Sequence, residues 1–278
     1  MQNKKNLLFF VTLLAFAVFS SGCGVVYGLM AKDRLNEGVR DFNKGKYAKA
    51  EAEFKSAIEY SADVKNGQFF YARAIQERFK QELTEESGLL TIAEFEKVVQ
   101  STDEERKDGA LAFQAAVYDQ LVSVVPAKAQ EYTQKRYDTL LKRAALPNAT
   151  PEVKSAVYAI IGTDKYNASY GISSGYERQG YSAIPPDAIA KMKPLVTEAH
   201  LYLQKAIAAN PDNSSPVYYD GLTYLEEAKM ETDPAKKESF KKLKAQRDKD
   251  YEAAEKRARA KEEAKAKEEA EKAQPPTP

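Results

Sequence analysis

The chain has 278 residues, of which 42 are lysine or arginine and 41 are aspartate or glutamate, so its formal net charge is only +1. That balance does not favour binding to nucleic acid or to an anionic membrane surface through charge. One cysteine excludes a disulfide within the chain, and one cysteine with one histidine cannot supply the usual ligands of a zinc site. Alanine, glutamate, lysine and leucine recur at helical spacing, and no stretch alternates like a strand, so we expect an all-α protein.

The first residues have the layout of a bacterial export signal. Two lysines precede an apolar run over residues 7–19, and small residues follow at 20–22. The run is too short for a comfortable transmembrane helix, which needs about 20 apolar residues. The only cysteine, Cys23, comes directly after it. This arrangement resembles the lipobox of bacterial lipoproteins.

In that family the cysteine thiol receives a diacylglycerol, the signal is removed, and the new amino group is acylated. The resemblance implies that residues 1–22 are a signal peptide and that Cys23 is lipidated, with a tether over residues 23–31. Gly24 rather than aspartate follows the cysteine. By the sorting rule of enterobacterial lipoproteins, this implies anchoring in the outer membrane, facing the periplasm. A secreted protein with a free thiol and an uncleaved amino-terminal anchor are the alternatives.

Residues 35–63 predict a pair of short helices. The first begins near Lys32, and Gly45 permits a turn before the second. Small and aromatic residues recur at fixed positions of this pair, namely Gly38, Gly45, Tyr47, Ala50, Phe54 and Ala57. The pattern resembles a tetratricopeptide repeat. A second match has Ala199, Leu203 and Ala206 in a second helix, and Pro211 where the repeat ends.

The intervening chain predicts further helices. One hairpin covers residues 69–83 and 89–101, and another covers 105–125 and 127–146, parted at Pro126. A further helix should begin with Thr150 as its cap. In total we expect four to five hairpins in a repeat domain over residues 32–251, in which stacking of the hairpins buries their apolar faces.

The repeat resemblance implies a groove, lined mainly by first helices, that binds protein or peptide partners. Six residues fall at groove-facing positions of the family: Leu35, Val39, Phe42, Tyr218, Leu222 and Leu225. The lysines and asparagines that clamp a carboxylate in one variety of the family are not present at these positions. An apolar or aromatic peptide surface is therefore the expected partner.

Residues 166–182 are rich in tyrosine and glycine, and we expect them to form a loop. Tyrosine is common in binding surfaces, which makes Tyr170 and Tyr176 candidates for contact with a partner. The alternative is an insertion that folds over the repeats.

A last helix should begin after Asp233 and Pro234. Its expected inner face holds Phe240, Leu243, Arg247 and Tyr251. Residues 252–272 have alanine as their only apolar residue, so we expect residues 252–278 to be a solvated charged helix with a disordered end. A spacer reaching toward a partner is the alternative.

No motif of an enzyme active site occurs. His200 has no second histidine at metal-ligand spacing, and nucleophile-elbow and phosphate-loop patterns do not occur. We therefore expect no catalytic residue, no cofactor and no metal, and a membrane-anchored scaffold that binds protein or peptide partners in the cell envelope. Two alternatives are a structural component of an outer-membrane assembly machine and an envelope ligand-binding protein or enzyme that uses the tyrosine-rich segment.

Overall fold

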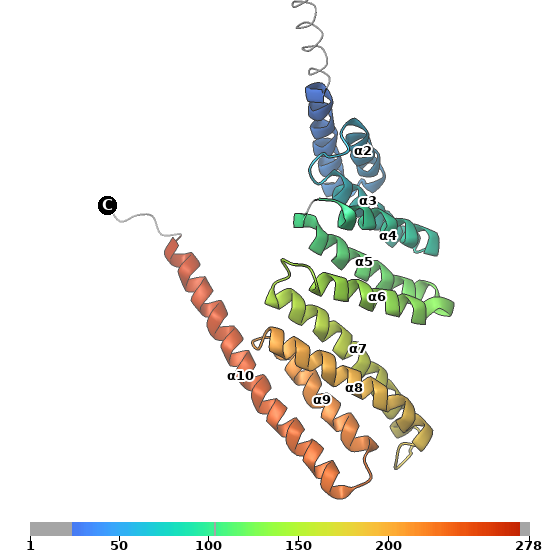
Figure 1. Ribbon diagram of the computed structural model, residues 1–278, viewed down its shortest axis with the longest axis vertical. Helices are drawn as coiled ribbons and strands as arrows, with labels where there is room; N and C mark the ends of the chain where they lie inside the picture. The colour runs from blue at the N-terminus through green and yellow to red at the C-terminus, as the bar shows by residue number, and fades with distance from the viewer. Residues whose placement is uncertain (1–23, 103, 273–278) are drawn as a thin grey trace, which may run out of the picture. The chain divides into compact units, whose positions relative to one another are not determined.

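The computed structural model describes residues 24–102 and 104–272, and no strand occurs among them (Figure 1). The expected all-α class is therefore confirmed for this part of the chain. The predicted signal peptide, Cys23 and the last six residues lie outside the described residues, so the roles assigned to them stay predictions.

The described helices follow the predicted order closely. They are residues 24–43, α2 (Tyr47–Tyr60), α3 (Gly67–Glu82), α4 (Glu85–Gln100), α5 (Glu104–Val124), the short 3-10 helix η1 (Pro126–Lys128), α6 (Ala129–Ala144), α7 (Pro151–Arg178), α8 (Pro186–Ala209), α9 (Ser214–Met230) and α10 (Pro234–Lys272). We call residues 24–43 the amino-terminal helix. The part of the predicted tether that the structure describes belongs to this helix.

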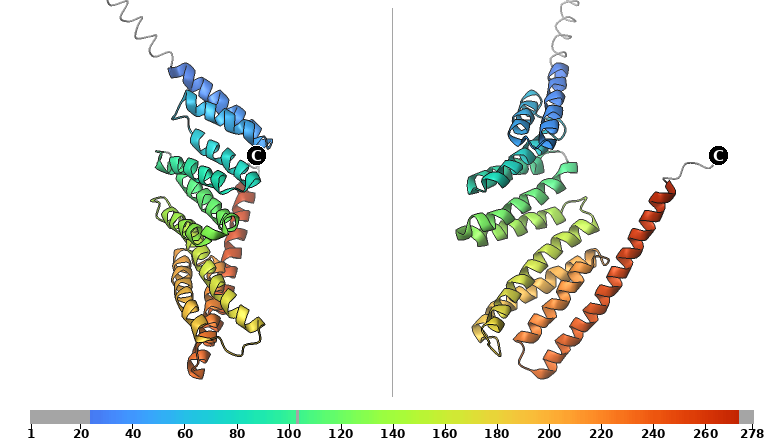
Figure 2. Two further views of the ribbon diagram at one scale, coloured as in Figure 1. Left: turned by 90° about the vertical axis from the view of Figure 1, so that its right-hand side faces the viewer. Right: turned by 180° about the vertical axis from the view of Figure 1, so that it is seen from behind.

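The helices form two compact units, and the division falls within α6 between Lys142 and Arg143. In the first unit, α3 packs against both α2 and α4, and α4 packs against α5. In the second unit, α7 packs against α8 and α9, and α9 also packs against α8 and α10 (Figure 2). The repeat domain predicted over residues 32–251 is thus divided between two units.

Glycines allow large side chains to enter the helix interfaces. A Cβ atom added to Gly38 would lie 2.5 Å from the ring of Phe54, which is fully buried. The same arrangement recurs in the second unit, where a Cβ atom on Gly162 would lie 2.7 Å from Cγ of Leu203. Such distances leave no room for a methyl group, so each glycine sets the separation of its two helices.

Helix boundaries have local causes, and the sequence predicts two of them, at Thr150 and Gly45. The Thr150 hydroxyl accepts a hydrogen bond from the Val153 backbone N–H at 3.3 Å, so it caps α7 as expected. Thr84 caps α4 in the same way, through the N–H of Ser87 at 3.2 Å. Gly45 has a φ of +72°, which fits the turn before α2.

The loop predicted over residues 166–182 is wrong for most of its length, because α7 continues to Arg178. Its small residues pack against neighbouring helices: Ser169 and Ser173 are fully buried, and Tyr166 joins a core cluster with Ala199 and Leu203. Tertiary packing therefore overrides the low helix propensity of glycine and serine in this segment.

The inner face of α10 also differs from the prediction. Leu243 is 42% exposed, whereas Phe240, Arg247 and Tyr251 are partly buried. Ala254 is fully buried, although we expected residues from 252 onward to be solvated.

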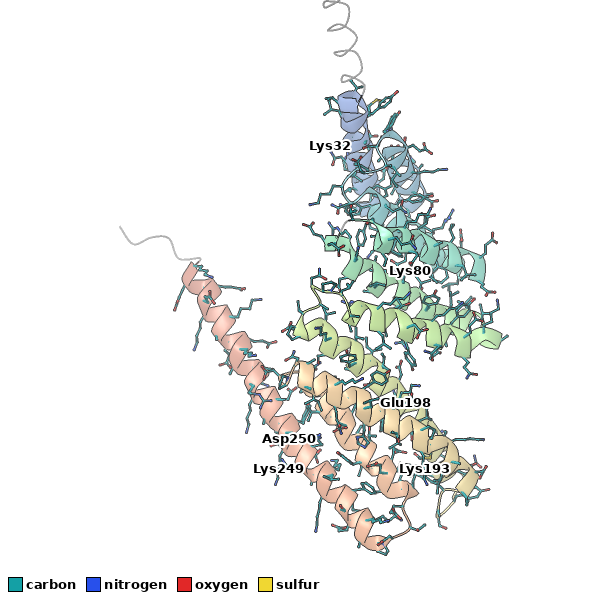
Figure 3. All side chains as sticks on the ribbon, in the orientation of Figure 1. Lys32, Lys80, Lys193, Glu198, Lys249 and Asp250 are labelled. Atoms are coloured by element: carbon teal, nitrogen blue, oxygen red, sulfur yellow. The ribbon has the colours of Figure 1, made fainter. Side chains whose placement is uncertain are left out.

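The contacts of α10 continue past Ala254. Asp212, after α8, accepts a hydrogen bond from Nε of Arg257 at 2.8 Å and forms an ion pair with Lys261. Residues 262–272 are exposed, and their side chains extend into solvent (Figure 3). The solvated part of α10 therefore begins about ten residues later than the composition suggests.

Candidate partner-binding surface

A hollow of about 440 Å³ lies in the second unit, at the end of α7, the connection to α8, the end of α9 and the start of α10. We call it the tyrosine–lysine pocket and define it by Tyr176, Tyr181, Ile184, Leu225, Lys229, Lys237 and Lys241. It combines aromatic and aliphatic side chains with lysine ammonium groups.

The apolar part of the pocket comes from three segments. The rings of Tyr176 and Tyr181 meet edge to face, with centroids 5.3 Å apart. Ile184 before α8 and Leu225 on α9 add aliphatic surface. Edge-to-face contact orients the two tyrosine rings relative to each other, so they offer an aromatic surface whose geometry is largely set before a partner binds.

The cationic part is anchored by Lys229 on α9. Its ammonium donates a hydrogen bond to the buried Glu226 at 2.9 Å and pairs with Glu177 at 3.1 Å. Burial by itself lowers the pKa of Lys229, but the hydrogen bonds from Lys229 to Glu226 and Glu177 outweigh it and raise the pKa. Lys229 therefore remains charged, and the same ammonium lies 5.3 Å from the ring centroid of Tyr170.

Two further lysines, Lys237 and Lys241, reach the pocket from the first turns of α10. Lys241 lies 3.8 Å from Glu238, a distance that leaves the pair weak and solvent-screened. Glu177 is the acidic residue among those that line the pocket, and it is paired with Lys229. The lining therefore carries a net positive charge beside its apolar surface.

The structure brings together some of the predicted binding residues of the second unit. Tyr176 and Leu225 line the pocket, and Tyr170 adjoins it through Lys229. Leu222 instead packs against the core cluster of Tyr166, Ala199 and Leu203. Tyr218 is 47% exposed and contacts Tyr251 of α10 at 5.8 Å between ring centroids, away from the pocket lining.

The predicted groove residues of the first unit lie in a different setting. Leu35, Val39 and Phe42 are partly buried and pack against a core cluster that includes Phe54 and Ala74. They therefore contribute to helix packing, and only part of each side chain is left for contact with a partner. Their role in binding stays a prediction.

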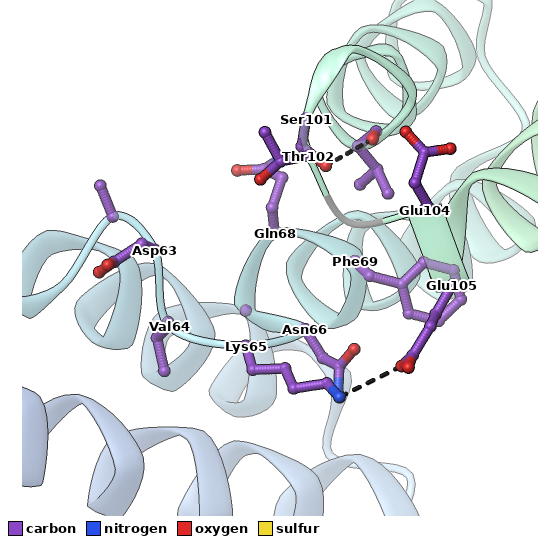
Figure 4. Close-up of a pocket in the computed structure, with 13 residues that line it drawn as sticks. Asp63, Val64, Lys65, Asn66, Gln68, Phe69, Ser101, Thr102, Glu104 and Glu105 are labelled. Carbon is purple, nitrogen blue, oxygen red and sulfur yellow. Dashed lines mark hydrogen bonds and ion pairs between the residues drawn. The ribbon is translucent and has the colours of Figure 1, made fainter.

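A second hollow, of about 650 Å³, lies in the first unit beside the connection from α2 to α3 (Figure 4). One pair of charged groups in its lining is joined, because Nζ of Lys65 lies 3.2 Å from Glu105. Asn66 of the lining accepts a hydrogen bond from Nε of Arg106 at 2.7 Å. None of the predicted binding residues lines it. The tyrosine–lysine pocket is for these reasons the stronger candidate.

The single histidine belongs to a buried ion cluster between α8, α9 and α10. Nδ1 of His200 lies 2.6 Å from Asp220, and Nε2 lies 3.3 Å from Glu227. Burial alone would lower the pKa of His200, but its hydrogen bond to Asp220 and its close contact with Glu227 raise the pKa to about 9. Because carboxylates hold both ring nitrogens, the ring is not available as a general base at neutral pH.

The acidic members of this cluster, Asp220 and Glu227, were not predicted from the sequence, whereas Arg247 was expected on the inner face of the last helix. Asp220 is fully buried on α9 and accepts a hydrogen bond from Nε of Arg247 on α10 at 2.7 Å. The helical pattern does place Asp220 one position before Gly221, at the packed face of α9. That position was the signal that could have identified it.

Among the described residues, no group of three or more histidine, cysteine, aspartate or glutamate side chains is placed to hold a metal ion. Within the same residues, no single helix is long and apolar enough to cross a membrane, although α5 with the η1–α6 segment, bent by 118°, meets that criterion as a pair by length and composition. No model of a known protein family matches the chain, and no curated protein matches it either.

Proposed function

We propose that the protein is a membrane-anchored scaffold of tetratricopeptide-like hairpins that binds protein or peptide partners in the bacterial cell envelope. Lipid on Cys23 attaches it to the outer membrane, facing the periplasm. The contact of Gly38 with Phe54 supports the repeat assignment, because these are the small and aromatic positions that match the repeat. The burial of Ala50 and Ala57 beside Phe54 supports it further.

The observation that carries the binding role is the tyrosine–lysine pocket. Tyr176 and Leu225, predicted separately as binding residues, line one hollow together with three lysines. Aromatic side chains near a cationic rim suit a peptide segment that carries an apolar side chain next to a carboxylate. We propose such a segment of a protein partner as the occupant.

Affinity capture tests this function. The full-length protein, extracted from membranes in detergent, is compared with Tyr176→Ala and with Lys237→Glu, and captured proteins are identified by mass spectrometry. A tyrosine at the centre of an interface contributes about 2 kcal/mol, so the variants should lose the same specific partner while their melting temperatures stay near that of the wild type.

Lys193→Glu serves as the matched control, because Lys193 is an exposed lysine of α8 outside the pocket lining (Figure 3). Equal capture by the control and by both pocket variants would place the binding surface elsewhere. Loss of capture together with a large drop in melting temperature would identify Tyr176 as a structural residue.

A second candidate function is binding of a small molecule in the envelope. The volume of about 440 Å³ lies in the range of small-molecule sites, and the lining combines apolar surface with a few polar groups. A thermal-shift screen of aromatic carboxylates distinguishes this function. A concentration-dependent rise in melting temperature that Lys237→Glu removes would favour it over peptide binding.

A further inference from the structure

The first two turns of the amino-terminal helix expose a continuous set of large apolar side chains. Their exposed fractions are 66% for Val25, 55% for Val26, 51% for Tyr27, 63% for Leu29 and 38% for Met30. No charged residue occurs between Gly24 and Ala31, and Lys32 is the first that follows. Such a cluster on the surface of a protein marks a site of contact with an apolar phase or a partner.

These side chains are spread around the helix. At about 100° per residue, they cover more than half of its circumference, and the remaining positions are glycine or alanine. No face of this segment is polar. A helix that is apolar all round belongs inside a large core or a membrane, whereas a single protein groove covers one face. The distribution therefore favours lipid as the occupant.

The contacts of the helix show where its unsupported part ends. Ala31 is fully buried, and Tyr27 stacks on Tyr60 at the end of α2 with centroids 6.2 Å apart. The amino-terminal helix extends past α2 (Figure 1). Residues 24–30 span about 10 Å, which matches the depth of about 5–10 Å to which interfacial helices enter a bilayer.

We propose that residues 24–30 insert into the interfacial region of a phospholipid bilayer, with acyl chains around Val25, Val26 and Leu29. Lys32, exposed one turn later, then lies at the headgroup layer (Figure 3). The choice of lipid as occupant rests on the proposed membrane attachment at Cys23, which directly precedes this segment. The inserted turns are a second attachment, made by the polypeptide itself.

Fluorescence quenching tests the insertion. The sequence contains no tryptophan, so Leu29→Trp creates a single reporter, and Leu89→Trp is the matched control on α4, where Leu89 is 41% exposed. The full-length chain, matured in cells and purified from membranes, is reconstituted into phosphatidylethanolamine–phosphatidylglycerol vesicles with or without brominated acyl chains. Bromine should remove about half of the emission of Leu29→Trp and leave Leu89→Trp unchanged.

Flotation of the vesicles, measured in parallel, reports on membrane attachment independently. Protein that floats with the vesicles while Leu29→Trp is unquenched disproves the insertion but leaves the attachment intact. Protein that neither floats nor is quenched disproves both. Emission of Leu29→Trp that shifts to the blue with rising protein concentration, without quenching by bromine, shows that a second copy covers the helix and also overturns the proposal.

A disruption experiment gives an independent readout. Val25→Asp combined with Leu29→Asp should accelerate dissociation of the acylated protein from vesicles about tenfold, because two charges cannot enter the apolar region cheaply. Leu89→Asp should leave the dissociation rate unchanged. Identical dissociation rates for the wild type, the double variant and Leu89→Asp would show that the acyl chains alone hold the protein to the membrane.

Discussion

Two glycines of α7 differ only in what surrounds them. Gly162 lies against α8, where an added Cβ atom would be 2.7 Å from Cγ of Leu203 and 3.0 Å from its backbone nitrogen. Gly175 belongs to the same helix, yet nothing lies within 4 Å of a Cβ atom built on it. The same substitution at these positions should therefore have opposite effects.

We predict that Gly162→Ala lowers the free energy of unfolding by about 1–3 kcal/mol, because the backbone of α8 must move to admit the methyl group. Gly175→Ala should raise it by up to about 1 kcal/mol, because alanine restricts the unfolded chain without a clash. Urea denaturation of both variants provides the measurement. A Gly162→Ala variant as stable as the wild type would show that α7 and α8 are not held at this separation.

The His200 cluster predicts a specific dependence of stability on pH. Its pKa is raised from 6.5 to about 9, so the protonated ring stabilises the fold fully below pH 6.5, and this stabilisation is lost as the pH rises through about 9. The groups that face the ring are Asp220, Glu227 and Tyr224 on α9, with Arg247 of α10 bound to Asp220.

We expect the wild type to lose on the order of 2–3 kcal/mol of unfolding free energy between about pH 6 and about pH 9.5 relative to His200→Gln. Urea denaturation of both proteins at the two pH values checks this, and subtraction of the two profiles removes the titrations that they share. Parallel profiles would mean that the pKa of the ring is the same in the folded and the unfolded protein.

Buried apolar residues were easier to predict from sequence than buried charges. Ala50, Phe54 and Ala57 are all fully buried, as the repeat pattern indicates, because their spacing along one helix defines its inner face. Asp220 and Glu226 are equally buried. The arginine that pairs with Asp220 comes from another helix, and the lysine that pairs with Glu226 reaches it only in the right side-chain conformation. The partners of Asp220 lie on α8 and α10, so spacing within α9 cannot reveal them, and the i,i+3 spacing of Glu226 and Lys229 does not show that Glu226 is buried.

At the scale of elements, α10 consists of a segment that packs against the second unit and a segment that is exposed to solvent. Up to Lys261 it is tied to the second unit, for example by Ser214, which donates a hydrogen bond to Glu255, and by the contacts of Asp212 with Arg257. Residues 262–272 are exposed throughout. Composition alone could not locate this boundary, because alanine packs against a neighbouring helix without any large apolar side chain.

Two truncations should separate these segments. Ending the chain after Lys261 should leave the melting temperature unchanged, since only exposed residues and weak ion pairs are removed. Ending it after Glu252 should lower the free energy of unfolding by about 1–2 kcal/mol, because the burial of Ala254 and the contacts of Asp212 are lost. Differential scanning calorimetry measures both, and equal melting temperatures would mean that α10 docks only up to Glu252.

The tyrosine-rich part of α7 shows why local composition misled the prediction. Glycine and serine favour turns in isolation, but here Ser169 and Ser173 are fully buried on a helix that packs against α8 and α9, whereas Gly171 and Gly175 have open space beside them. The helix continues because packing from two neighbours exceeds a weak local preference. As a result, Tyr170 and Tyr176 are presented from a rigid helix rather than from a loop.

For the whole molecule, the order of the helices followed from the sequence, but the division into two units did not. Caps, prolines and periodicity are local signals, and they gave each hairpin in turn. The division within α6 depends on which helices pack most closely, and residues on one helix do not reveal that. The tyrosine–lysine pocket was missed for a similar reason, because nothing in the sequence distinguishes its three lysines from the many other lysines of the chain.

The proposed attachment of the whole molecule to a membrane depends on Cys23, which lies outside the described residues. We predict that Cys23→Ser abolishes acylation and either releases the protein or leaves it as an uncleaved precursor. Metabolic labelling with an alkyne fatty acid, followed by membrane fractionation, provides the measurement. A mature wild-type protein that starts at another residue and carries no lipid would refute the assignment.

The ion pairs of α10 have a consequence for how the chain finds its fold. Ala254 is the only fully buried side chain among the described residues of α10, so apolar packing alone would let the helix slide along α9. Two ion pairs hold α10 at points about 15 Å apart along its axis, one between Asp220 and Arg247 and the other between Asp212 and Arg257. A shift by one turn would leave the carboxylate of Asp220 buried without its arginine, an error too costly to persist. These ion pairs therefore set the register of α10 against α9. They contribute little net stability, yet they select one register from several whose free energies are otherwise nearly equal.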